Sequence, residues 1–179
     1  GVIVLMFVCL CFPGRVQARP LAIDVGGTIS VNTTWTKANS PYVVTQSVYV
    51  NSGVVLTIEP GVLVKFTQNT GLYIQGNGQL LAVGAVGEPL VLTSLRDDTY
   101  GGDTNNDGSA TAPVARSWGN IRVASTGNAS FDYAIVSYAG GNGCYDSYTN
   151  SGLCNQGGNL AVSNSTIAFN GNYGIYHIS

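Results

Sequence analysis

The sequence predicts an all-β protein built as a right-handed parallel β-helix, a solenoid of about 24 residues per coil with inserted loops. Charged residues make up only 9% of the chain, whereas 24 of its 179 residues are glycine. A helical bundle is disfavoured because it needs a wide polar face. Short apolar segments separated by Gly, Pro, Asn or Gln recur from residue 47 onward. No stretch after residue 18 has an apolar stripe at helical spacing, so crossover helices are not expected.

The chain begins with an apolar run of twelve residues, which is too short for an ordinary membrane span. A Pro-Gly pair and the small-x-small pattern Val16-Gln17-Ala18 follow this run, as at a signal-peptidase site. We therefore interpret residues 1–18 as a signal peptide whose start lies upstream. A buried strand or an anchor helix is the alternative. We expect a secreted or cell-surface protein with no membrane span in its mature part.

The coil repeat starts at residue 47, after a lead-in segment or N-terminal cap over residues 19–46. A shift of 24 residues aligns three pairs of apolar residues, namely Val48 with Leu72, Val50 with Ile74, and Leu56 with Leu80. An antiparallel sandwich also has short strands, but it does not explain a constant shift. The coils therefore continue over residues 47–179, with the inward side chains of stacked strands forming one core.

The second half of the chain repeats with a longer shift. Residues 131–140 superpose on residues 162–171 with a shift of 31, and a cysteine-containing loop after Gly140 explains the added length. Solenoids accept such insertions because each coil contacts only its neighbours. The segment Glu59-Pro60-Gly61 has proline and glycine in the positions that favour a type II turn.

Two of the four cysteines, Cys144 and Cys154, lie in a loop rich in Gly, Asn, Ser and Tyr. Their spacing does not match the two-plus-two arrangement of a zinc site, and the single histidine, His177, is distant in sequence. We predict a disulfide between them, which would contribute roughly 2–3 kcal/mol by the chain-entropy model. Two free thiols are the alternative.

The most acidic segment of the chain follows the strand predicted around residue 92. Its candidate metal ligands are Asp97, Asp98, Asp103, Asn105 and Asp107. The last three alternate ahead of a glycine, as in the first half of a calcium loop, and hard oxygen ligands suit Ca²⁺. The bidentate Glu of an EF-hand is missing, so we expect a structural Ca²⁺ site with a Kd of about 10⁻⁴–10⁻³ M. A surface turn without a metal is the alternative.

The segments Leu56–Phe66, Pro89–Ser94 and Trp118–Ile121 resemble bacterial secreted right-handed β-helix repeat proteins of the pectate-lyase-like superfamily. The run Asn164–Asn172 is similar to coils of that superfamily in which asparagines stack along a turn. The resemblance covers roughly residues 28–179. It implies the fold, but the superfamily contains lyases, hydrolases, adhesins and structural repeats.

Catalytic residues are not predicted within the chain. Asp97 and Asp98 are adjacent and would point to opposite faces of a strand, so they do not form the paired acids of a glycosidase. Arg96, Arg116 and Arg122 are the basic residues that a lyase could use, and we place the last two on solvated edges. We therefore predict a structural or carbohydrate-binding module. The alternative is part of a polysaccharide lyase or glycoside hydrolase with its catalytic coils elsewhere.

The expected partner is a polysaccharide or a cell-surface glycan. A formal net charge of −2 and the lack of a basic stripe argue against nucleic acid. Tyrosines gather near the predicted loops, as sugar-stacking platforms do, at positions 100, 138, 145, 148 and 173. Tyrosine also packs beside glycine corners with its hydroxyl in water, and we favour that interpretation. We likewise expect Trp118 to be packed at the start of a strand.

Overall fold

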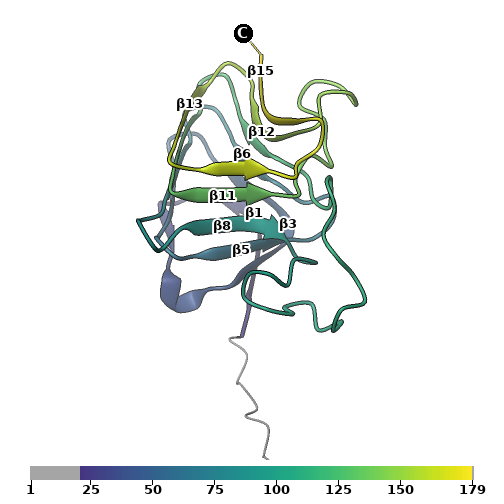
Figure 1. Cartoon of the computed structure of the whole chain (residues 1–179). Coiled ribbons are helices and arrows are strands. Elements are labelled where there is room, and N and C mark those ends of the chain that lie inside the picture. Colours follow the sequence, from purple (N-terminus) through teal and green to yellow (C-terminus); the bar gives the residue numbers. More distant parts are fainter. Residues whose placement is uncertain (1–20, 179) are drawn as a thin grey trace, which may run out of the picture.

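The computed structural model describes residues 21–178, whose regular secondary structure is almost entirely β-strand (Figure 1). The predicted signal peptide, residues 1–18, lies outside the described residues. The strands are β1 (Ile23–Ile29), β2 (Thr33–Trp35), β3 (Tyr42–Val50), β4 (Val55–Ile58), β5 (Leu63–Phe66), β6 (Leu72–Ile74), β7 (Gln79–Val83), β8 (Leu90–Ser94), β9 (Ile121–Val123), β10 (Asn128–Asp132), β11 (Ala134–Ser137), β12 (Ser151–Asn155), β13 (Asn159–Ser163), β14 (Thr166–Ala168) and β15 (Tyr173–His177). A 3₁₀ turn, η1 (Lys37–Asn39), precedes β3.

The strands form two parallel sheets. One sheet has the order β14-β11-β8-β5-β3-β6-β9-β12-β15, with β1 also paired to β3, and the other has the order β13-β10-β7-β4-β2. Every pairing between named strands is parallel. The antiparallel sandwich is therefore wrong for the part of the chain that the structure describes.

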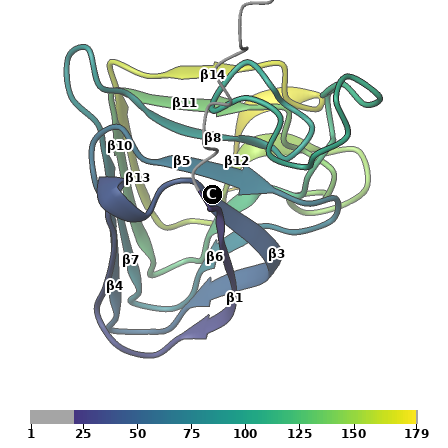
Figure 2. The same ribbon diagram turned by 90° about the horizontal axis from the view of Figure 1, so that it is seen from below.

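The long strand β3 divides the first sheet into two arms. We call β5, β8, β11 and β14 the first arm, and β6, β9, β12 and β15 the second arm. Each winding of the chain adds one strand to each arm and then one to the five-stranded sheet, as β5, β6 and β7 do. The sheets nearly close around one interior in a solenoid-like arrangement (Figure 2). In Figure 1, β5, β8 and β11 lie one above another.

The predicted alignments of the repeats are confirmed. Val48 pairs with Leu72 and Leu56 pairs with Leu80, both at the expected shift of 24. Phe131 pairs with Val162 at the shift of 31. Leu80 also pairs with Ala129, a shift of 49, because the insertion between β8 and β9 lengthens that coil by about one repeat.

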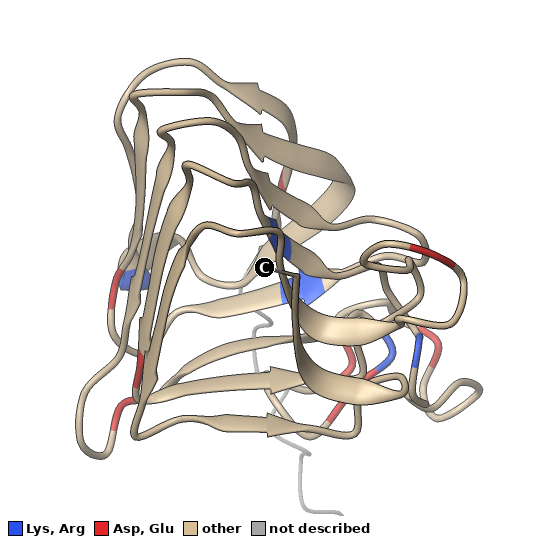
Figure 3. Ribbon diagram, turned by 90° about the horizontal axis from the view of Figure 1, so that it is seen from above, with Lys and Arg blue, Asp and Glu red and all other residues tan. Residues whose placement is uncertain are grey.

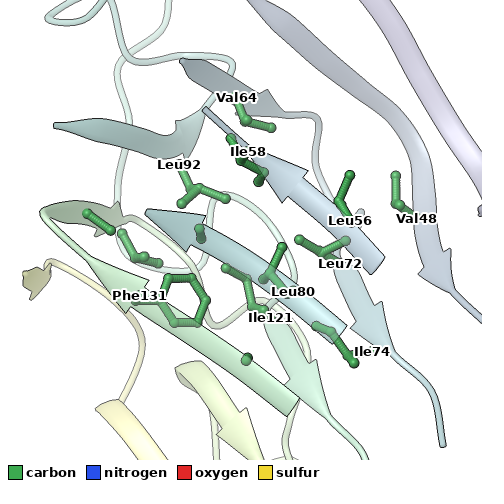
Figure 4. Packing of buried hydrophobic residues seen from close by; sticks show 14 of the residues in the cluster. Val48, Leu56, Ile58, Val64, Leu72, Ile74, Leu80, Leu92, Ile121 and Phe131 are labelled. Carbon is green, nitrogen blue, oxygen red and sulfur yellow. The ribbon is translucent and has the colours of Figure 1, made fainter. Parts of the chain in front are cut away.

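One continuous core runs through the stacked coils. Alternate residues of each strand point inward, and Leu56, Leu80 and Phe131 on the five-stranded sheet are all at most 1% exposed. In Figure 4, Leu56 and Leu80 project from neighbouring strands into the same interior. Trp118 is fully buried and stacks on Phe66 with ring centroids 4.0 Å apart, as expected for a packed residue.

The segment over residues 19–46 also contributes to the sheets, since β1 pairs with β3 and β2 pairs with β4. The predicted turn at residues 59–61 closes with a hydrogen bond from the Val62 amide to the Glu59 carbonyl, 3.3 Å long. Gly61 has a φ of 72°, in the left-handed region that a type II turn requires at that position. Within residues 21–178, no helix has the length and apolar character needed to span a bilayer.

Candidate functional site

Three outward-pointing side chains are aligned on the second arm and its neighbour β3. Tyr49 of β3 pairs in register with Tyr73 of β6, which pairs with Arg122 of β9. Each lies between two buried residues of its own strand. Because successive residues of a strand point to opposite faces, all three point away from the core.

The three side chains contact one another. The Tyr49 and Tyr73 rings have centroids 5.2 Å apart and are tilted by 45°. The guanidinium carbon of Arg122 lies 5.4 Å from the centroid of the Tyr73 ring, a cation–π arrangement. Asn142 donates a hydrogen bond to the Tyr73 hydroxyl at 3.0 Å, which fixes the ring from its far end.

These residues line a groove of about 500 Å³, which we call the tyrosine–arginine groove. Its lining residues are Tyr49, Tyr73, Ile74, Gln75, Gly76, Arg122, Ala124 and Gln156. The Nε atom of Arg122 is buried and has no hydrogen-bond partner within the described residues. The groove therefore combines two aromatic surfaces with amides and one cation.

A disulfide lies next to Arg122 of this groove. Cys144 and Cys154 are bonded, as predicted, and Cys154 is the register neighbour of Arg122 on β12. The bond holds the inserted loop against the arm, and Arg122 donates a hydrogen bond to the Gly143 carbonyl of that loop at 2.8 Å. The placement of Arg122 on a solvated edge is therefore wrong, because its side chain is half-buried between Tyr73 and the loop.

The acidic segment forms a loop between β8 and β9, and it carries several of the charges drawn in red and blue in Figure 3. Carboxylate oxygens of Asp98, Asp103 and Asp107 all lie within 4.8 Å of one another. Asn105 contacts this group, because its amide donates to Asp107 Oδ2 at 2.7 Å. The structure thus brings together four of the five predicted metal ligands.

Asp97 differs from the other four candidates. Its carboxylate accepts hydrogen bonds from the Thr93 hydroxyl at 2.6 Å and from the Thr99 amide at 3.1 Å, and the residue is 1% exposed. Next to it, the ammonium of Lys65 donates to the carbonyls of Asp97 and Gly102, each at 2.8 Å. Burial lowers the pKa of Lys65, while the nearby carboxylates, led by Asp98, oppose that shift.

The other residues that the sequence suggested for a functional role are spread over several loops and strands. Arg116 is exposed, as expected, and donates to Asn172 Oδ1 at 2.6 Å. Tyr145 and Tyr148 are 79% and 78% exposed on the cysteine loop, whereas Tyr138 stacks on Phe169. A second, polar groove of about 600 Å³ includes His177 of β15, together with the amides Gln79, Asn128, Asn155 and Asn159.

The sequence interpretation missed the tyrosine–arginine groove. The signal was present, because the shift of 24 that aligns Val48 with Leu72 also aligns Tyr49 with Tyr73. Arg122 could not be added in the same way, since the acidic loop separates it from Tyr73 by 49 residues. Comparisons with protein-family models, with curated proteins and with solved structures gave no match to this chain.

Proposed function

We propose that this protein is a secreted or cell-surface module, built as a right-handed parallel β-helix, that binds carbohydrate in the tyrosine–arginine groove. The observation that carries the proposal is the register alignment of Tyr49, Tyr73 and Arg122 on three adjacent strands. Aromatic rings offer flat apolar surfaces with a polar tip, which suit the C–H faces of sugars. A guanidinium offers a planar set of donors that matches the carboxylate of an acidic sugar.

The fold and the location are parts of the same proposal. Crossover connections between parallel strands of one sheet are right-handed in about 98% of cases, which favours that winding here. The Cys144–Cys154 disulfide is weak support for an oxidising compartment outside the cell. The apolar run at the start of the sequence, interpreted as a signal peptide, agrees with that location.

Binding is favoured over cleavage. Among the described residues, those that line the groove include no carboxylate and no histidine. A glycosidase of the common type needs two carboxyl groups that flank the scissile bond. One nitrogen of the Arg122 guanidinium donates to the Gly143 carbonyl and the group lies over the Tyr73 ring, so its orientation is held without using all of its donors.

The test is a glycan array that contains both neutral and uronate-bearing oligosaccharides, followed by calorimetric titration of the ligands that bind. If the Tyr49 ring covers about 50 Å² of a sugar, about 25 cal/mol per Å² gives roughly 1.2 kcal/mol. Tyr49→Ala should then raise Kd about eightfold. The matched control is Tyr148→Ala, which removes a 78% exposed ring from the cysteine loop and should leave Kd unchanged.

Two results would refute the proposal. One is the absence of saturable binding to any oligosaccharide on the array. The other is equal affinity of the wild type and the Tyr49→Ala variant, with both showing the same circular dichroism spectrum. A preference for uronates that disappears in Arg122→Gln would support the role given to the guanidinium.

A further inference from the structure

The acidic loop between β8 and β9 contains a set of oxygen atoms whose environment is not explained by the protein alone. Asp98 Oδ1, Asn105 Oδ1 and Asp107 Oδ1 each expose less than 1 Å². None of the three has a hydrogen-bond partner within the described residues. Buried polar atoms are normally paired, so three unpaired acceptors in one loop indicate a missing partner.

The missing partner must accept electron density from oxygen. All three unpaired atoms are hydrogen-bond acceptors. Two belong to carboxylates and one belongs to a neutral amide, so all three could contact the same positively charged partner. The amide group of Asn105 is already used, since its nitrogen donates to Asp107 Oδ2 and to Thr111 Oγ1. Its orientation leaves the oxygen unpaired.

The backbone of the loop is fixed separately from these atoms. The Asp103 carboxylate accepts hydrogen bonds from the amides of Asp107 and Gly108, at 3.0 and 2.9 Å. Lys65 donates to the carbonyls of Asp97 and Gly102, on either side of Asp98. Because the Lys65 ammonium donates to these two carbonyls, it does not supply the partner of Asp98 Oδ1.

We propose that Asp98, Asp103, Asn105 and Asp107 bind one Ca²⁺ ion. Ca²⁺ takes carboxylate and amide oxygens at 2.3–2.6 Å, so two ligands on opposite sides of the ion are about 4.6–5.2 Å apart. The carboxylate oxygens here lie within 4.8 Å of one another, inside that limit. Asp97 is not assigned as a ligand, because the carboxylates that converge are those of Asp98, Asp103 and Asp107, whereas the Asp97 carboxylate contacts Thr93 and Thr99.

The ion would hold the loop against the outer surface of the first arm. Lys65 and Thr93 point outward from β5 and β8, yet both are 0% exposed. Their contacts with Asp97 and Gly102 show that the start of the acidic loop covers them. Ca²⁺ therefore joins the distal part of the loop, residues 103–107, to the part that is already attached to the sheet.

The test is calorimetric titration of the chelator-treated full chain with CaCl₂, alongside the variants Asp98→Asn and Asp24→Asn. Asp98→Asn keeps the shape of the side chain and removes one negative charge from the site. Asp24→Asn makes the same chemical change at an exposed position on β1. The wild type and Asp24→Asn should bind one ion with a Kd of about 10⁻⁴–10⁻³ M, and Asp98→Asn should bind about tenfold more weakly or beyond detection.

Hydrogen exchange gives a second measurement. Saturating Ca²⁺ should slow exchange of amides 98–108 in the wild type and leave the core strands unchanged. A wild-type titration with no saturable heat up to about 10 mM CaCl₂ would overturn the proposal, because extracellular sites bind at 10⁻⁴–10⁻³ M. Equal affinity in Asp98→Asn and the wild type would overturn the assigned ligands.

Discussion

The stacking of the coils can be tested with two adjacent leucines of β7. Leu80 is 0% exposed and lies in register between Leu56 and Ala129 on the neighbouring strands. Leucine-to-alanine changes in a core cost about 2–5 kcal/mol, and more where the cavity cannot collapse. The methyl group of Ala129 is too small to fill the cavity left by the leucine side chain. We therefore expect Leu80→Ala to lower the free energy of unfolding by about 3–4 kcal/mol.

The adjacent substitution provides the matched control. Leu81 has the same side chain but points outward, where its register neighbours are Thr57 and Ser130, and it is half-buried. Leu81→Ala should therefore cost about 1 kcal/mol or less. Both free energies of unfolding can be measured by urea titration followed by circular dichroism. Equal losses for the two variants would refute the assignment of Leu80 to the core and Leu81 to the outer face, an alternation on which the core and the groove both depend.

Two further predictions concern the loops and turns. Reducing the Cys144–Cys154 disulfide, which spans a sequence separation of 10, should lower the free energy of unfolding by about 3 kcal/mol. Amide exchange in the cysteine loop should become faster, while the strand signal in circular dichroism persists. Loss of that signal would contradict the prediction. Hydrogen bonds from Asn164 and Ser163 lower the pKa of the exposed Asp132 carboxyl below 3.8. Its stabilising contribution is thus fully present above pH 3.8 and is lost as the pH falls through the folded-state pKa. In an NMR titration, Ser163→Ala should raise that pKa, and an unchanged value would refute the assigned cause.

Much of the fold could be predicted from the sequence because the apolar residues recur at a nearly constant spacing. Residues that stack in successive coils meet the same surroundings, so apolar types return at the coil period, as Leu56 and Leu80 do. The same reasoning did not identify strands within the lead-in segment, residues 19–46. Residues of β1 pair with β3 across a register shift, and such a bulge removes the constant spacing by which a repeat is recognised.

The structure of the loops was harder to predict from the sequence. The oxygen-rich turn of the acidic segment could be predicted, because Asp and Asn ahead of a glycine favour tight turns. The sequence could not show which carboxylates would converge. Asp97 leaves the group because the hydroxyl of Thr93, on the preceding strand, is within 2.6 Å of its carboxylate. That contact depends on the backbone conformation of the loop just after β8. This conformation cannot be read from the spacing of apolar residues.

The core and the groove use the same register on opposite faces of the strands. Where Leu72 stacks on Val48 toward the interior, Tyr73 stacks on Tyr49 toward solvent. Core packing specifies the inward residues, but nothing in the packing requires two aromatic rings on the outside, where most residue types are tolerated. The insertion before β9 moves Arg122 far along the chain and still returns it to the same register position beside Tyr73. The proposed binding role depends on these outward residues, so Tyr49, Tyr73 and Arg122 are the first residues to substitute.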